Sequence, residues 1–374
     1  MMFRAFAAAI ALFFAGSAAL AQTFDTEKGR IAVATVAGGL EQPWGIDFLP
    51  DGRMIVTEKP GQLRLVTADG KVSAPVRGVP RVDDGGQGGL LDVTVHPDFG
   101  TNRLIYLSYS EAGPGGVSTA MASGRLSADG TRLENVKTLF SQRPKVRGGR
   151  HFGSRVVFAP DGNVFLTTGD RGARHNAQKL DGHIGKVIRL TPDGDVPADN
   201  PFAGKPGALP EIWSYGHRNI QGAAIHPRTG RLWTIEHGPR GGDEINIPAA
   251  GANHGWPVVT HGIEYSGGVI GDGLKTKPGM ADPIYTWTPV IAPGGMTFYT
   301  GNLFPAWKGN LLIGGLRAGA LVRLELNGDK VVREERLLRQ IGDRIRDVAV
   351  GPDGAVYAIT DSADGRILRI TPAG

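Results

Sequence analysis

One pattern recurs along the chain: a short apolar strand, a turn rich in Pro, Asp and Gly, and a second apolar strand. Its copies lie at residues 46–58, 93–108, 156–170, 223–238, 300–316 and 348–361. Pro presets φ at the second position of a turn and Gly accepts positive φ, so Pro-Asp-Gly between two apolar runs predicts a tight turn. The copy at 300–316 keeps its strand and Gly but lacks the Pro-Asp-Gly. Six copies predict six related β units.

The spacing of the copies points to one architecture. Successive copies are roughly 50–75 residues apart, which is too long for a leucine-rich or ankyrin repeat and suits a four-stranded propeller blade with extended loops. We therefore predict an all-β fold, a six-bladed β-propeller of four-stranded antiparallel blades. Segments 29–40 and 365–372 are expected to share a blade and close the ring. A β-sandwich with coincidental turns is the alternative.

Composition agrees with a turn-dense β protein. The chain has 374 residues with 57 Gly and 25 Pro, which would interrupt helices throughout. Its hydrophobic fraction of 41 % argues against a disordered chain. The chain has no Cys, so motifs that need thiols are excluded, and with them a C-x-x-C-H haem site.

The first 21 residues resemble an export signal. Arg4 precedes an apolar run, residues 5–15, and the small-residue triplet Ala19-Leu20-Ala21 follows. We predict a signal peptide at 1–21 cleaved before Gln22, a single propeller domain at 22–374, and a periplasmic or secreted protein. The apolar run is short for a membrane span and no later run approaches 18 residues, so no membrane insertion is expected. A buried N-terminal helix is the alternative.

Charge and motif content exclude several functions. The formal net charge is +5, but no Lys/Arg cluster stands out, so nucleic acid is not an expected partner. The sequence contains no G-x-S-x-G, Walker A, H-E-x-x-H or G-x-G-x-x-G motif, which disfavours triad hydrolysis and a nicotinamide cofactor. His96 and His226 each precede a Pro in a repeat turn, so we interpret them as structural.

Four loop stretches carry more specific chemistry: 83–99, 149–172, 211–227 running on to 236–246, and 341–354 together with 314–319. They contain Gln87, His151, Asp170, Arg218, Asn219, Arg317, Arg344 and Arg346. Four arginines at one end of a propeller predict a cationic pocket, and guanidinium groups suit bidentate recognition of carboxylates. The alternative is that these arginines pair on the rim with Asp343, Asp347 or Glu244.

Several of these motifs resemble one family. The stretches H-F-G-S-R…P-D-G…T-T-G-D, G-H-R-N-x-Q-G, E-H-G-P-R-G-G-D-E and R-I-R-D-V…P-D-G closely resemble the soluble quinoprotein sugar dehydrogenases. These are the aldose, glucose and sorbosone dehydrogenases that use pyrroloquinoline quinone (PQQ). The resemblance runs from Leu40-Glu41-Gln42-Pro43-Trp44-Gly45 to the last predicted blade. It implies a six-bladed propeller, PQQ with Ca²⁺ in the channel mouth, and oxidation of an aldose to its lactone with electrons passing to an external acceptor.

The resemblance also implies roles for the loop residues. Arg317, Arg344 and Arg346 would hold carboxylates and quinone edges, and Gln87, Asn219 and Asp170 would orient the ring. Arg317 stands where some relatives have Lys, and a guanidinium keeps the charge but changes the hydrogen-bond geometry.

Its catalytic positions match three residues of this chain. His151 matches the family's general base, a task that a neutral imidazole performs near neutral pH. Asp170 would orient or polarise His151, and Arg218 would stabilise charge on the quinone oxygen.

Metal and substrate positions are implied in the same way. Gly238-Pro239 matches the loop whose carbonyls bind the cofactor's Ca²⁺, and Ca²⁺ accepts backbone oxygen ligands. Glu244 and the carbonyl of His254, where some relatives have Tyr, would bind a second, structural Ca²⁺. Trp287 resembles an aromatic lining the mouth, where an indole packs against sugar C–H faces; an ordinary core Trp is the alternative.

Two rival functions share this architecture. A Ca²⁺-dependent sugar lactonase would need side-chain carboxylates converging on the metal and would not need the arginines. A non-catalytic propeller that binds a protein or a glycan would leave the loops at His151 and Arg218 without a role.

Overall fold

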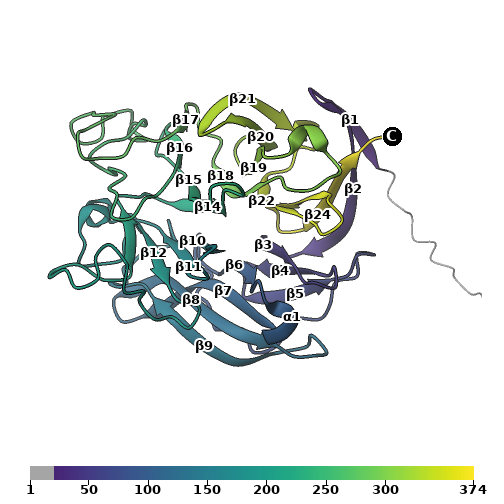
Figure 1. The fold of residues 1–374 in the computed structure, drawn as a ribbon, viewed down its shortest axis with the longest axis horizontal. Coiled ribbons are helices and arrows are strands. Elements are labelled where there is room, and N and C mark those ends of the chain that lie inside the picture. The colour runs from purple at the N-terminus through teal and green to yellow at the C-terminus, as the bar shows by residue number, and fades with distance from the viewer. Residues whose placement is uncertain (1–20) are drawn as a thin grey trace, which may run out of the picture.

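The innermost strands of six antiparallel sheets surround a central axis, as Figure 1 shows. The computed structural model describes residues 21–374, so the predicted signal peptide, apart from Ala21, lies outside the described residues and stays a prediction. Four blades have four strands, the first has three, and the closing blade has five. The predicted propeller is confirmed. None of the helices in residues 21–374 combines the length and the apolar character that a membrane crossing requires.

We number the blades in chain order of their innermost strands. Blade 1 consists of β3 (Pro43–Phe48), β4 (Met54–Glu58) and β5 (Gln62–Val66), and blade 2 of β6 (Leu90–Val95), β7 (Leu104–Gly113), β8 (Gly116–Leu126) and β9 (Leu133–Ser141). Blade 3 consists of β10 (Gly153–Phe158), β11 (Val164–Thr168), β12 (Lys186–Leu190) and β13 (Ile212–Tyr215). Blade 4 consists of β14 (Ile220–Ile225), β15 (Leu232–Glu236), β16 (Asp243–Asn246) and β17 (Tyr285–Trp287).

The last two blades complete the ring. Blade 5 consists of β18 (Pro293–Phe298), β19 (Leu311–Gly315), β20 (Ala320–Asn327) and β21 (Lys330–Leu337). Blade 6 consists of β22 (Ile345–Val350), β23 (Val356–Thr360) and β24 (Gly365–Pro372), followed by β2 (Gly29–Leu40) and β1 (Gln22–Thr26). The helices are short: α1 (Phe99–Asn102) and the 3₁₀ turns η1 (Arg174–Gln178), η2 (Pro305–Trp307) and η3 (Arg339–Ile341).

Five of the six repeats form the inner hairpins of blades, in which the innermost strand pairs with the next strand. The repeat at 300–316 is the exception. It contains only β19, and the innermost strand of blade 5, β18, precedes it. The expectation of two strands in this segment is wrong because the connection between β18 and β19 contains η2, in which Pro305 begins a 3₁₀ turn.

The first and last segments of the described chain close the ring as expected. Strand β2 pairs with β24, with Val33 opposite Ile370, and β1 adds a fifth strand outside it. The turn between β1 and β2 also contacts blade 5. The backbone N–H of Glu27 donates to Glu335 Oε1 over 2.7 Å, and the buried guanidinium of Arg323 lies 3.6 Å from Glu27. Blade closure therefore joins the two ends of the described chain to a neighbouring blade.

A buried ion cluster crosses the propeller axis. Arg155 on β10 donates through Nη1 to Asp92 Oδ1 at 2.7 Å and Asp347 Oδ2 at 2.9 Å, and through Nε to the Gln221 carbonyl at 2.7 Å. Burial alone would lower the pKa of Arg155, but Asp347 and Asp92 raise it. Asp347 also accepts the backbone N–H of Ile46 over 3.1 Å. One guanidinium thus connects blades 2, 3, 4 and 6, and Asp347 extends the connection to blade 1.

The space for this cluster depends on a glycine. A Cβ at Gly295 in β18 would lie 1.6 Å from Asp347 Oδ1 and 2.5 Å from Arg155 Nη2. A side chain there would overlap the ion pair, so the small residue in blade 5 is required by packing at the axis.

We expect Arg155→Met to lower the free energy of unfolding by about 3–5 kcal/mol, because it leaves two buried carboxylates without their cation. Urea denaturation followed by circular dichroism measures the effect. The control is Arg125→Met, which removes a half-exposed guanidinium paired with Glu134 on blade 2 and should cost about 1 kcal/mol or less. Equal effects of the two changes would contradict the assigned role of the axial cluster.

Candidate functional site

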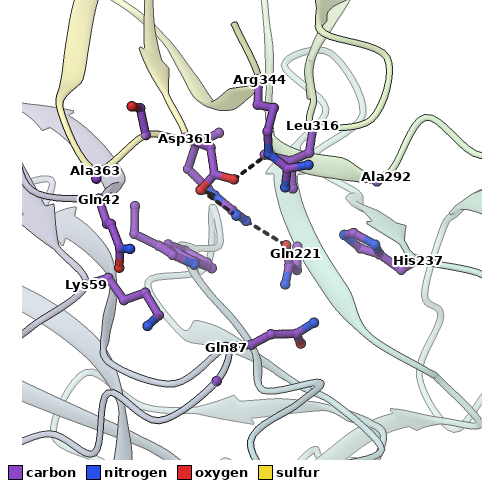
Figure 2. A pocket seen from close by; sticks show the side chains of 14 residues that line it. Gln42, Lys59, Gln87, Gln221, His237, Ala292, Leu316, Arg344, Asp361 and Ala363 are labelled. Carbon is purple, nitrogen blue, oxygen red and sulfur yellow. Dashed lines mark hydrogen bonds and ion pairs between the residues drawn. The ribbon is translucent and has the colours of Figure 1, made fainter.

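A cavity of about 350 Å³ opens at one end of the propeller channel. Figure 2 shows side chains from several blades around it. The lining residues are Gln42, Trp44, Lys59, Gly86, Gln87, Gln221, His237, Ala292, Leu316, Arg344, Arg346, Asp361, Ser362 and Ala363. Most of them precede or begin an innermost strand, or follow the second strand of a blade. In an antiparallel hairpin these two positions lie at the same end, opposite the turn, so the Pro-Asp-Gly turns lie at the other end of the channel.

One wall of the cavity carries paired arginines. Arg344 Nε lies 2.8 Å from Asp361 Oδ2, and Arg346 Nη2 lies 2.9 Å from Asp361 Oδ1. Arg346 Nη1 also donates to Gln221 Oε1 over 3.0 Å. Burial alone would raise the pKa of Asp361, but the arginines hold it below its ordinary value. One carboxylate thus stands against two guanidinium groups.

The alternative pairing on the rim is not formed with the carboxylates that it named. Arg344 and Arg346 pair with Asp361, which follows β23, and with none of Asp343, Asp347 or Glu244. Lys59 adds a cation to the lining and donates to the Asp84 carbonyl over 2.8 Å. Arg317 is exposed and follows the lining residue Leu316, but does not itself line the cavity. Of the four arginines predicted to form a cationic pocket, Arg344 and Arg346 line the cavity, and Lys59, which was not predicted, supplies its third cation.

An indole provides a flat surface in the lining. Trp44 is 5 % exposed, and the guanidinium carbons of Arg155 and Arg346 lie 4.5 and 5.9 Å from its ring centroid. Because Arg155 belongs to the axial cluster, the Trp44 ring packs directly against that cluster. The cavity therefore combines a flat aromatic surface with fixed positive charge.

His151 lies beside this cavity on a constrained loop. Its φ is 57°, in the left-handed region, and its imidazole is 13 % exposed. The Gln87 side chain accepts the His151 backbone N–H over 2.7 Å, and the Asn219 side chain accepts the Gly153 N–H over 3.1 Å. These amides therefore hold the His151 loop from blades 2 and 4. A residue outside its favoured φ region needs such support.

The His151 ring is paired with Asp170. Nδ1 of His151 lies 2.6 Å from Oδ1 of Asp170, which is 1 % exposed. Burial lowers the pKa of His151 and the hydrogen bond to Asp170 opposes this, while Arg218 lowers it further. Within residues 21–374 the Nε2 atom makes no hydrogen bond. The pair therefore resembles a neutral base held by an ionised partner.

Arg218 places a buried cation next to this pair. Arg218 is 6 % exposed, its Nη1 donates to the His237 carbonyl over 3.1 Å, and its Nε has no partner within the described chain. A buried donor without a partner is costly, so we interpret Arg218 Nε as a donor that is available to an acceptor atom of a ligand. His237 itself lines the cavity and bonds the Pro293 carbonyl through Nε2 over 2.7 Å.

Two segments have oxygen atoms suited to a cation. Gly238 and Pro239 are buried, and neither carbonyl accepts a hydrogen bond from another residue between 21 and 374. Glu244 lies with Glu236 around Asn246, whose Nδ2 donates to both, and burial with the nearby Glu236 raises the pKa of Glu244 to about 8. Asn246 Oδ1 and both ring nitrogens of the buried His254 lack partners in the described residues.

Trp287 lies away from the cavity. It is 4 % exposed on the outer strand β17, its Nε1 donates to Glu334 Oε2 over 2.7 Å, and its ring packs against Tyr285 with centroids 4.7 Å apart. The expectation that this indole lines the mouth is not supported, because the strand that carries it is the outermost in blade 4. The core alternative describes its position.

Several residues at the site were not predicted from the sequence. They are Gln42, Trp44, Lys59, Gln221, His237, Trp256 and Asp361. Gln42 and Trp44 lie within a stretch that the resemblance already covers, and Asp361 ends the last repeat as Asp170 ends the third. The same position at the end of the second strand could therefore have indicated Asp361.

Comparison with known proteins decides the family. The Glucose / Sorbosone dehydrogenase family matches residues 40–369. The chain belongs to this family. The resemblance inferred from the motifs is thereby confirmed, and with it membership of a family of oxidoreductases.

Individual relatives cover most of the chain. It is 46 % identical to aldose sugar dehydrogenase YliI of Escherichia coli K12, over 91 % of this chain and 93 % of that protein. A crystal structure of a glucose dehydrogenase is 48 % identical, with a TM-score of 0.89 over 91 % of this chain and 99 % of that one. The PQQ-bound form of aldose sugar dehydrogenase from Streptomyces coelicolor is 28 % identical, with a TM-score of 0.73 over 91 % and 98 % of the two chains.

We expect His237 to stay neutral from pH 8 down to pH 5. Burial lowers its pKa to about 3, and the cations Arg218 and Arg346 add to the effect. NMR titration of ¹³C-labelled histidines measures the protonation of His237, and the exposed His175 serves as the solvent-accessible histidine for comparison. A His237 resonance that titrates with its midpoint above pH 5 would contradict the assigned electrostatics.

Proposed function

We propose that this chain is an exported PQQ- and Ca²⁺-dependent aldose sugar dehydrogenase. It oxidises the hemiacetal carbon of an aldose to the lactone, and the electrons leave to an external acceptor. The proposal rests above all on one observation: a cationic, flat-walled cavity with Lys59, Arg344 and Arg346 lies beside a His151–Asp170 pair. The PQQ-bound relative from Streptomyces coelicolor supports the same cofactor.

PQQ is a planar molecule with three carboxylates, and the cavity lining fits such a group. Arg344 and Arg346 keep donors beyond those used by Asp361, and Lys59 adds a third cation. The indole of Trp44 gives an aromatic ring a surface to lie on. Arg218 Nε is a buried donor without a partner in the described chain, which suits an acceptor oxygen on the bound group. Arg317 is exposed and follows the lining residue Leu316, so its side chain would have to turn inward to reach an edge of the bound cofactor.

The oxygen atoms described above fit Ca²⁺. The carbonyls of Gly238 and Pro239 would hold the ion that accompanies PQQ, since Ca²⁺ takes backbone oxygen ligands. Glu244 and the His254 carbonyl would hold the second ion, and ionised Glu244 would be stabilised there by the cation. When bound, PQQ with Ca²⁺ supplies the two-electron acceptor for the sugar.

The chain's own residues then perform the proton chemistry. Nε2 of neutral His151 takes the proton of the sugar hydroxyl, and Asp170 holds the Nδ1–H and stabilises the imidazolium that forms. The lowered pKa of His151 keeps the base neutral at pH 7. Gln87 and Asn219 hold the backbone N–H groups of His151 and Gly153, so in this mechanism both position the base, and Gln87 also lines the cavity.

The two rival functions fit the cavity less well. A lactonase needs several carboxylates directed at a metal in the cavity, but among residues 21–374 the only carboxylate in its lining is Asp361, which is paired with two arginines. A binding propeller needs neither the constrained His151 nor its hydrogen bond with Asp170.

Reconstitution tests the proposal. Metal-free protein is supplied with PQQ and Ca²⁺, and reduction of an acceptor dye is followed with a panel of aldoses. We expect reduction that requires the sugar and both additions, with the lactone as product by mass spectrometry. Absence of PQQ binding under these conditions would remove the quinoprotein assignment.

We expect His151→Ala to lower kcat by about 10²–10⁴-fold, because it removes the general base. PQQ binding, measured by absorbance titration, should stay within a few-fold of the unaltered protein. The matched control is His175→Ala, which removes an exposed imidazole on η1 and should change neither quantity. Full turnover by the His151 variant would remove this residue from the mechanism.

A further inference from the structure

Both oxygens of Asp170 are held, and they are held from two different blades. Oδ1 accepts from His151 Nδ1 at 2.6 Å and from the Gly172 N–H at 2.7 Å. Oδ2 accepts from the indole Nε1 of Trp256 at 2.8 Å. Asp170 follows β11 in blade 3, whereas Trp256 lies in the long segment, residues 247–284, that connects β16 to β17 in blade 4. The carboxylate orientation is therefore determined jointly by two blades.

The indole is itself fixed on several sides. Trp256 is 7 % exposed, its backbone N–H donates to the Gly216 carbonyl over 2.9 Å, and its backbone carbonyl accepts from Gln178 Nε2 over 2.8 Å. Its ring packs with Ala177 and Ile270. A side chain anchored through backbone and ring contacts can transmit position to the group it bonds.

Two guanidinium groups lie against the same ring. The Cζ atoms of Arg218 and Arg174 are 5.3 and 5.9 Å from the centroid of the Trp256 ring. Arg174 on η1 is in turn paired with Glu264, with Nη1 and Oε1 2.6 Å apart. This ion pair joins the loop that follows Asp170 to the segment that carries Trp256, so it closes the contact between blades 3 and 4 around the indole.

We propose that Trp256 is a positioning residue for His151: its indole N–H fixes the Asp170 carboxylate, which in turn presents the His151 ring with Nε2 free. The role as base rests on the proposed function, whereas the positioning does not. A carboxylate that loses one of its donors becomes more basic and binds an imidazolium more tightly. Without the indole donor, His151 should therefore take up its proton at higher pH.

Other charged groups around the pair bear on this titration. Arg218 and Arg150 lower the pKa of His151, and the neutral ring of His237 lies nearby. Arg171, also close to Asp170, is held by the Arg150 and Gly148 carbonyls. None of these groups is removed by a change at Trp256, so comparing Trp256→Phe with the unaltered protein isolates the effect of the indole donor.

The test replaces Trp256 with Phe, which keeps an aromatic ring but removes the donor. We expect the NMR titration midpoint of His151, measured in the full chain without added PQQ, to rise by roughly 0.5–1 pH unit. In the reconstituted enzyme the acid limb of the kcat/KM profile should move upward by a similar amount, because the base is lost to protonation at higher pH.

The chain offers a matched control. Trp287→Phe removes another buried indole donor that bonds a carboxylate, here Glu334 on β21 of blade 5. It should leave the His151 titration unchanged. An unchanged midpoint in the Trp256 variant, or an equal shift in both variants, would overturn the proposal.

A second measurement guards against loss of folding. In the unaltered protein the indole Nε1–H resonance of Trp256 should shift with the same midpoint as His151, because both donors bond the Asp170 carboxylate, whereas the indole resonance of Trp287 should not. If Trp256→Phe does not fold, a Trp256 resonance that does not follow the His151 titration overturns the proposal. If the midpoints shift but the unaltered protein shows no sugar-dependent reduction, the proposed function fails and the positioning role stands.

Discussion

The geometry of this propeller depends on the buried guanidinium of Arg155. It binds Asp92 and Asp347 and a carbonyl of blade 4, so blades that are far apart in the sequence share one ion cluster at the axis. Burying these charges is favourable only when they are paired and hydrogen-bonded together. Burial raises the pKa of Asp92 and the charge of Arg155 opposes this shift, so the carboxylate depends on the guanidinium to stay ionised. Because the cluster contacts Trp44, it also supports the lining of the cavity.

The cavity lies at one end of the channel for a topological reason. Each blade begins at the axis with an innermost strand and returns through a hairpin, so loops before the first strand and after the second meet at the same end. The cavity is thus assembled from five blades: blades 2, 4 and 5 each contribute two lining residues, blade 1 contributes three and blade 6 contributes five. Such an assembly needs connections between blades, and Asn219, Arg346 and Trp256 provide them through bonds to Gly153, Gln221 and Asp170.

Much of the site could be predicted from the sequence, but not its pairings. His151, Asp170 and the arginines 344 and 346 lie in loops whose motifs are local, and the structure brings them to one end. The pairing of those arginines with Asp361 was not predicted, since nothing local relates residue 346 to residue 361 across the hairpin of blade 6. Trp287 illustrates the opposite error: its motif suggested the mouth, and its place on the outer strand β17 buries it instead.

The sequence by itself determined the repeat, the number of blades and the closure of the ring, because turn chemistry and apolar alternation act over a few residues. It also indicated which loops carry charged and imidazole side chains. Only the tertiary structure decided which of these meet, since the contacts of Arg155, Asp170 and Trp256 join residues from different blades. Whether a Trp packs in the core or lines the site depends on which strand of a blade carries it, and the local sequence around the Trp does not decide this. The physical reason is that burial and charge pairing depend on neighbours that are distant along the chain.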